Sequence, residues 1–347
     1  MADPTDDIAH LLSDAVRQRT FPGAVWAVGD ADTTLHSGRT GLLDPAHPEV
    51  EMSMETIFDV ASLTKILAVW SALGALWQDH VLPLDEQLGT FWPEVAGRPL
   101  GQVTARHLLT HTAGVPLRAN LKSLYGTDPQ AIRLGVLAEA LHRPAGQAVE
   151  YTDRAALILG YLAEHLTATP LDQLAHQRIW QPLGMSHTRF GPLPAPLAAR
   201  CAPTEFDEET GVHLKGVPHD FSARLLGGVC GIAGVFSTVH DLTLFQRHLL
   251  APMPGPAHVG FGPAWGSESL QVHTGDLTPA RGLFWHPAPG TCPEDGIYVH
   301  YGFTGTALWI STERERWAVL LTNKLFFSRD RDPLMTVRNA FRALAFQ

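Results

Sequence analysis

A long apolar segment, residues 60–77, constrains the fold of this chain more than any other feature. Its apolar residues fall on every side of a helical projection, so the segment predicts a fully buried helix rather than an amphipathic surface helix. Lys65 is its only charged residue. A buried ammonium is costly unless it pairs with an anion, reaches a cleft or loses its proton through a lowered pKa. The same conditions turn a lysine into a general base.

A serine lies three residues before this lysine. Ser62 and Lys65 are spaced i and i+3, so a helix brings the hydroxyl and the amine onto one face, about one turn apart. Ser62 would also lie at the helix N-terminus, where free N–H groups favour developing negative charge. The alternative is an N-cap serine followed by a lysine whose stem is buried while its amine reaches the surface.

Composition excludes several classes of function. The chain has 347 residues, a net charge of −10 and 45% hydrophobic residues, which suits one large domain or two intermeshed ones. The acidic balance argues against nucleic-acid partners, and no apolar run reaches the roughly 18 residues of a membrane span. The N-terminus is acidic and does not read as a secretory signal, and the three cysteines are widely spaced. We therefore expect a cytoplasmic protein.

Hydrophobic periodicity divides the chain into three parts. We expect a helix over 6–19 and strands over 24–28 and 33–39, then a mostly helical middle, then strands over 283–285, 305–310 and 317–322 and a helix over 333–345. This order predicts an α/β (α+β) fold in which one antiparallel sheet, built from both chain ends, is flanked by helices. The predicted domains are 1–80 plus 250–347 for the sheet and 81–249 for an inserted helical domain, with the active site at their interface.

Six segments, in order along the chain, resemble the serine β-lactamase and penicillin-binding-protein superfamily. The resemblance is greatest to its class C branch, which includes esterases, D-amino-acid amidases and D-aminopeptidases. It implies a β-lactamase/DD-peptidase-like fold. The matching segments are Phe58-Asp59-Val60-Ala61-Ser62-Leu63-Thr64-Lys65, residues 107–114, Tyr151-Thr152-Asp153, residues 182–185, residues 227–236 and His300-Tyr301-Gly302-Phe303-Thr304-Gly305.

Tyr151 matches the tyrosine of the family's second motif, Tyr-x-Asn, where it shares proton transfer with the lysine. A phenol has an unperturbed pKa near 10, and a neighbouring ammonium would favour the phenolate. Asp153 stands where the family usually has Asn. This replacement removes an amide donor and adds a negative charge, which leaves open whether Asp153 contacts the lysine or the substrate. Tyr151 is alternatively a core tyrosine before a helix.

The third motif is normally Lys-Thr-Gly on a strand beside the cleft, and here it reads His300-Tyr301-Gly302. The resemblance implies that the lysine helps to bind the carboxylate of penicillins, whereas His300 is largely neutral at pH 7. We therefore expect anionic β-lactams to bind poorly. Gly302 would let substrate approach the strand. The resemblance also places the oxyanion hole at the backbone N–H groups of Ser62 and Phe303.

Other motifs carry little chemistry. His107 and His111 are spaced for one helical face, but Leu108 occupies the place of the metalloprotease glutamate, so we expect no metal. Residues 228–234 are rich in glycine but lack a phosphate-binding lysine, which favours a tight turn beside the site and no cofactor. No Gly-x-Ser-x-Gly sequence occurs, which argues against an α/β-hydrolase.

Together these features predict a cofactor-free serine hydrolase that cleaves an ester or amide through an acyl-serine intermediate. Ser62 is the expected nucleophile, and Lys65 and Tyr151 accept and relay its proton. The expected substrate is a small molecule, and an esterase or D-amino-acid peptidase or amidase is favoured. The alternatives are a β-lactamase or DD-carboxypeptidase, and a catalytically silent binding module. The sequence leaves the oligomeric state open.

Overall fold

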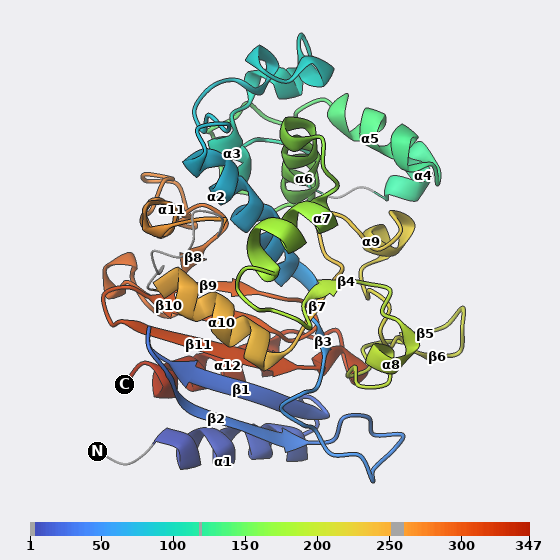
Figure 1. Ribbon diagram of the computed structural model, residues 1–347, viewed down its shortest axis with the longest axis vertical. Coiled ribbons are helices and arrows are strands. Elements are labelled where there is room, and N and C mark those ends of the chain that lie inside the picture. The colour runs from blue at the N-terminus through green and yellow to red at the C-terminus, as the bar shows by residue number, and fades with distance from the viewer. Residues whose placement is uncertain (1–3, 118–119, 251–259) are drawn as a thin grey trace.

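The computed structural model describes residues 4–117, 120–250 and 260–347, and an antiparallel sheet forms its lower half (Figure 1). The strand order in this sheet is β2-β1-β11-β10-β9-β8, so two strands from the N-terminal end lie beside four strands from the C-terminal end, with no strand from the middle. β1 pairs with β11 in a register that sets Trp26 opposite Leu320. The strands are β1 (Gly23–Gly29), β2 (Thr34–Gly41), β8 (His286–Pro287), β9 (Tyr298–Tyr301), β10 (Ala307–Ser311) and β11 (Arg316–Thr322).

Helices from the chain ends cover one face of the sheet. They are α1 (Pro4–Arg17) and α12 (Asp332–Ala345). Trp26 of β1 lies on this face, and its ring meets that of Phe341 edge-on at 6.3 Å. Val25 and Ala27 point to the opposite face, because side chains alternate along a strand. Since both faces of β1 are buried, the strand reads as a continuous apolar run.

The opposite face is covered by α10 (Val239–Leu250) and by the long apolar segment (Figure 1). That segment begins as a 3₁₀ turn (Ala61–Leu63), continues as a π-helix (Lys65–Trp70) and ends as α2 (Ser71–Gln78). Every residue of the π-helix is buried, which confirms the predicted buried helix. The other helices are α3 (Ala105–Leu109), α4 (Leu121–Tyr125), α5 (Pro129–Leu137), α6 (Asp153–Thr167), α7 (Leu171–Ala175), α8 (Ala195–Ala198), α9 (Phe221–Leu225) and α11 (Pro263–Ser269).

The mixed architecture of sheet and helices agrees with the predicted fold class, but the expected strand over 283–285 is wrong. Those residues are buried in an irregular segment, and Phe284 has a φ of 63°, which a strand does not allow. Pairing begins only at β8, which runs beside β9. Two small sheets also occur in the middle of the chain, formed by β3 (Phe58–Asp59), β4 (Arg189–Phe190) and β7 (Val235–Ser237), and by β5 (Phe206–Asp207) and β6 (Val212–His213).

We retain the division into a sheet domain and a helical domain as a proposal, with one change. Helix α10 falls inside the predicted helical range 81–249, yet it packs on β1 and β11. Its burial against the sheet places it with the sheet domain. The predicted boundary at 250 adjoins residues 251–259, which lie outside the described residues.

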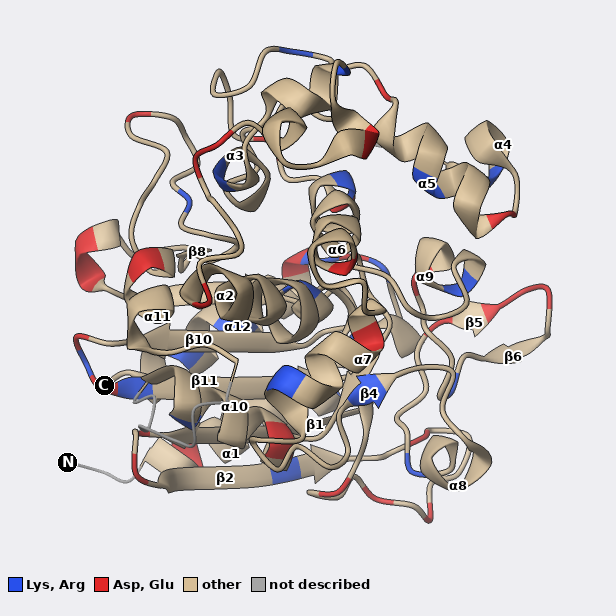
Figure 2. Ribbon diagram, turned by 45° about the horizontal axis from the view of Figure 1, so that its top comes forward, with Lys and Arg blue, Asp and Glu red and all other residues tan. Residues whose placement is uncertain are grey.

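Charges of both signs are dispersed over the elements of both halves (Figure 2). Within the described residues, we find no helix with the length and apolar character needed to cross a membrane.

Candidate active site

Ser62 lies at a sharp turn that is fixed by a buried carboxylate. Asp59, at the end of β3, accepts hydrogen bonds from the backbone N–H groups of Ala61 (2.8 Å) and His219 (2.7 Å). Burial raises the pKa of this carboxyl, although His219 and the backbone donors oppose the effect. Ala61 has a φ of 48°, a left-handed conformation that costs roughly 1 kcal/mol for a residue with a Cβ. The turn thereby presents Ser62 at the start of the buried helical segment.

The Lys65 ammonium is completely buried and has three acceptors. Its Nζ lies 3.0 Å from Ser62 Oγ, 2.9 Å from the Ile232 carbonyl oxygen and 2.8 Å from Asp153 Oδ1. Burial opposes the charge, but attraction to Asp153 and Tyr151 outweighs it and raises the pKa of Lys65 above its ordinary value. A buried lysine can pair with an anion, reach a cleft or lose its proton, and Lys65 pairs with an anion. The i, i+3 contact spans the junction between the 3₁₀ turn, which contains Ser62, and the π-helix, which begins at Lys65.

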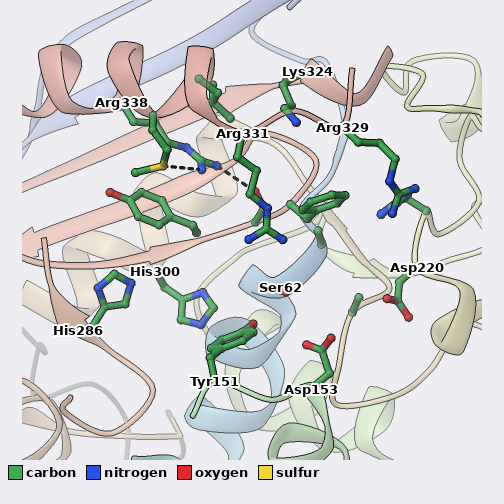
Figure 3. Close-up of a pocket in the computed structure, with 18 of the residues that line it drawn as sticks. Ser62, Tyr151, Asp153, Asp220, His286, His300, Lys324, Arg329, Arg331 and Arg338 are labelled. Atoms are coloured by element: carbon green, nitrogen blue, oxygen red, sulfur yellow. Dashed lines mark hydrogen bonds between the residues drawn. The ribbon is translucent and has the colours of Figure 1, made fainter. Parts of the chain in front are cut away.

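Ser62 opens onto a pocket of about 500 Å³ (Figure 3). Lys65 lies behind the serine and is not part of the lining, whereas the other residues singled out in the three motifs all contribute to it. In the view of Figure 3, Tyr151 and Asp153 lie below Ser62 and His300 lies beside Tyr151. The structure thus brings together Ser62, Tyr151, Asp153, His300, Gly302 and Phe303 from three separate parts of the chain.

Ser62 and Phe303 both line this pocket, and the backbone N–H group of neither residue has a hydrogen-bond acceptor among the described residues. Phe303 lies in a turn that is closed by a hydrogen bond from Gly302 N to the Thr306 carbonyl (2.8 Å). Arg338 fixes the same turn from behind, because its Nη2 donates to the carbonyls of Gly302 (2.9 Å) and Thr306 (2.7 Å). Two free donors beside a hydroxyl are the arrangement needed to hold an oxyanion.

The third-motif residues differ in what they contribute. His300, on β9, is buried, and its Nδ1 has no hydrogen-bond partner in the described part of the chain. Burial, followed by the charge of Lys65, lowers the pKa of His300 well below its ordinary value, so the imidazole is neutral at pH 7. At Gly302 a Cβ would lie 2.0 Å from Thr306 Oγ1 and 2.4 Å from the Val60 carbonyl. Glycine is therefore needed here for packing against the turn before Ser62.

Sequence reasoning missed several cations of the pocket. Arg281 places its guanidinium carbon 6.0 Å from the centre of the Tyr151 ring. Lys324, Arg329 and Arg331 approach the Phe303 ring at 5.4, 5.2 and 4.6 Å. The run at 329–332 alternates in charge, a pattern typical of a solvated turn, but its two arginines line the pocket. No local motif marks these residues, because the fold alone brings them to Ser62.

The remaining motifs have local structural roles. His107 forms a capping box with Thr104, and His111 stacks on Phe284 at 5.3 Å and lies 4.7 Å from the Tyr151 ring. The glycine-rich segment passes beside the site and provides the Ile232 carbonyl that holds Lys65. Cys230 within it is buried, and burial raises the pKa of its thiol to about 12.

Comparison with known proteins agrees with this arrangement. Residues 8–340 match the family model described as Beta-lactamase. A candidate D-alanyl-D-alanine carboxypeptidase of Escherichia coli K12 is 28% identical over 314 residues, which cover 79% of this chain and 70% of the relative.

Two solved structures share the fold. The unliganded simvastatin synthase LovD from Aspergillus terreus (selenomethionyl derivative) superposes with a TM-score of 0.77 at 19% identity, covering 100% of this chain and 98% of the other. A class C β-lactamase from Rhodobacter sphaeroides has a TM-score of 0.76 at 16% identity, covering 97% and 99%. Because the family model spans nearly the whole chain, this protein belongs to the β-lactamase family of serine hydrolases.

Proposed function

We propose that Ser62 is the nucleophile of this hydrolase, with Lys65 and Tyr151 as its proton-transfer pair and the N–H groups of Ser62 and Phe303 as its oxyanion hole. The observation that carries the proposal is the 3.0 Å contact between Lys65 Nζ and Ser62 Oγ at the end of an open pocket. A nucleophile and a base within hydrogen-bond reach, beside free backbone donors, form the constellation required for acyl transfer.

The Lys65–Tyr151 pair must lack one proton before it can accept another. Lys65 as an ammonium already has one acceptor for each of its three protons. The reactive form of the pair is therefore either a neutral amine beside a phenol or an ammonium beside a phenolate. Asp153 stabilises the fully protonated form, so we expect activity to rise with pH across the neutral range.

Acylation moves the Ser62 proton through the Lys65–Tyr151 pair to the leaving group. Ser62 Oγ bonds to the carbonyl carbon while its proton passes to the Lys65–Tyr151 pair, and the two backbone N–H groups hold the oxyanion. Collapse of the tetrahedral intermediate breaks the bond to the leaving group, which receives the proton from the pair. Water next attacks the acyl ester and gives one proton to the pair, and Ser62 Oγ takes that proton back as the acid leaves.

We propose a small ester or amide as the substrate, with esterase or D-amino-acid peptidase or amidase activity. The size of the pocket supports a small molecule, and the neutral His300 in place of the motif lysine supports a substrate unlike penicillin. Cys201, Cys230 and Cys292 are all free thiols, which supports the cytoplasm, a reducing compartment, as the location.

The test is a hydrolysis screen with p-nitrophenyl esters and D-aminoacyl p-nitroanilides. Ser62→Ala should abolish turnover of any substrate that the wild type cleaves, with an unchanged circular dichroism spectrum. Ser13→Ala is the matched control, because Ser13 lies in α1 on the far face of the sheet. Wild-type turnover that survives in Ser62→Ala would overturn the assignment of the nucleophile.

A further inference from the structure

The proposed oxyanion hole is assembled from two distant parts of the chain. The Ser62 N–H belongs to the turn after β3, and the Phe303 N–H belongs to the turn after β9. Two donors stabilise an oxyanion only when both already point at the position where its charge develops. The two turns must therefore be held in a fixed relation, and His219 contacts both of them.

The backbone of His219 is tied to the Ser62 turn through a shared carboxylate. Asp59 is buried, and its Oδ1 accepts from the Ala61 N–H in that turn. The other oxygen, Oδ2, accepts from the His219 N–H at 2.7 Å. Loss of either hydrogen bond would leave a buried carboxylate oxygen with fewer donors, which is costly. The backbone position of His219 is thereby coupled to that of the Ser62 turn.

The ring of His219 is tied to Phe303. The two rings are stacked, with their centres 5.5 Å apart and their planes inclined by 24°. Both residues line the pocket, and His219 is the only aromatic side chain among the described residues that meets the Phe303 ring. Figure 3 shows Arg329 and Asp220, the residue after His219, on the same side of Ser62. Because stacked rings have a preferred geometry, this contact restricts the plane of the Phe303 ring.

Glu205 fixes the orientation of the His219 ring. Nδ1 of His219 lies 2.7 Å from Glu205 Oε1. Burial opposes charge on Glu205, but His219 and Arg329 outweigh it and hold the pKa of this carboxyl below its ordinary value. An ionised carboxylate can only accept, so Nδ1–H is the donor. Arg329 completes the network, because it pairs with Glu205 Oε2 and its guanidinium lies 5.2 Å from the centre of the Phe303 ring.

We propose that His219 is a positioning residue for the oxyanion hole and acts through the Phe303 ring. The inference rests on the proposed function of Ser62 and Phe303 and adds a third residue to them. A side-chain rotamer and the φ and ψ angles of its residue restrict each other, so a fixed ring limits rotation of the Phe303 N–H. A donor held in this way needs no reorganisation when the oxyanion forms.

Hydrolysis of p-nitrophenyl butyrate by His219 variants tests the role of the ring. His219→Ala removes the stack and should lower kcat by about tenfold, part of the loss caused by removing a whole oxyanion donor, while KM changes by less than about twofold. His219→Phe keeps a ring on Phe303 and should recover most of the lost kcat. His219→Gln, which has no ring but can still donate to Glu205, should resemble His219→Ala.

His213→Ala is the matched control. His213 also stacks on a phenylalanine, Phe326 at 3.8 Å, and its Nδ1 contacts the Thr204 carbonyl oxygen, but it is not part of the pocket lining. This variant should retain the wild-type kcat. A wild-type kcat in His219→Ala, or an equal loss in His219→Phe and His219→Gln, would overturn the proposal. If His219→Ala does not fold, the comparison of His219→Phe with His219→Gln decides the question.

A double-mutant cycle separates positioning from a general structural role. Phe303→Ala keeps the backbone N–H but removes the ring, so that His219 no longer has a ring to orient. We expect His219→Ala to lower kcat by about tenfold in the wild-type background and by less than about twofold in the Phe303→Ala background. The same loss in both backgrounds would contradict action through the Phe303 ring. Thermal unfolding of each variant confirms that it is folded at the assay temperature.

Failure of the proposed function gives a different result. If the wild type does not cleave the ester, or Ser62→Ala cleaves it equally well, the assignment of Ser62 fails. The positioning is then judged by nuclear magnetic resonance of protein containing ¹⁵N-labelled phenylalanine, in which Phe303→Leu identifies the Phe303 amide signal. A shift of this signal in His219→Ala but not in His213→Ala supports the proposal, and an unshifted signal in His219→Ala refutes it.

Discussion

Lys65 Nζ, which is completely buried, lies 2.8 Å from Asp153 Oδ1, whose side chain is half exposed. The carboxylate therefore holds Lys65, the proposed catalytic lysine, in its charged form despite burial. The proposed attack by Ser62, in contrast, requires that the Lys65–Tyr151 pair has first lost one proton. We therefore predict that Asp153 influences the pH at which the enzyme becomes active.

Replacing Asp153 by Asn should move the acidic limb of the kcat/KM profile to lower pH. Asp153 raises the pKa of Lys65, so its removal leaves burial as the main effect and makes the proton easier to lose. We expect a shift of about one pH unit or more. Asp220→Asn, in the same pocket, is the control and should shift the limb less. A limb that stays in place or moves to higher pH in Asp153→Asn would contradict this role.

Lys65→Met should slow acylation by about 10²- to 10⁴-fold, the usual contribution of a positioned acid–base group. The methionine preserves the buried stem while removing the amine next to Ser62 Oγ. Burst kinetics with a p-nitrophenyl ester measure the acylation rate directly, and thermal unfolding confirms that the variant is folded. A normal burst rate in folded Lys65→Met protein would exclude Lys65 from proton transfer.

Gly302→Ala should destabilise the protein by about 1–3 kcal/mol and reduce kcat, because the new Cβ collides with Thr306 Oγ1 and the Val60 carbonyl. The collision pushes apart the two turns that carry the Phe303 and Ser62 N–H groups. Gly160→Ala, in helix α6, meets its nearest atoms only at 3.4 Å and is the matched control for urea unfolding. Equal stability of the two variants would show that the turns are not packed as described.

The sequence predicted the sheet from both chain ends because β1 and β11 have strong local signals, with apolar side chains on both faces. It failed at 283–285, where buried aromatic residues imitate a strand. Burial there comes from packing against the helical half, and Phe284 adopts a backbone conformation that no periodicity reveals.

The proximity of Ser62 and Lys65 was predictable because three residues separate them, and any helical turn brings them together. That Tyr151 and Phe303 belong to the site could be predicted only from the family resemblance. That Lys324 and Arg331 line the pocket could not be predicted, since it depends on how the segment after β11 folds. In the sequence, an isolated lysine or an alternating charge run cannot be distinguished from residues of a solvated surface.

Covalent labelling of Ser62 tests the central claim most directly. The protein is incubated with a fluorophosphonate, weighed intact and mapped by peptide mass spectrometry, alongside Ser62→Ala and Ser13→Ala. We predict one adduct per chain in the wild type and in Ser13→Ala, located at Ser62, and none in Ser62→Ala. A wild-type protein that remains unlabelled, or an adduct on another residue, would contradict the account.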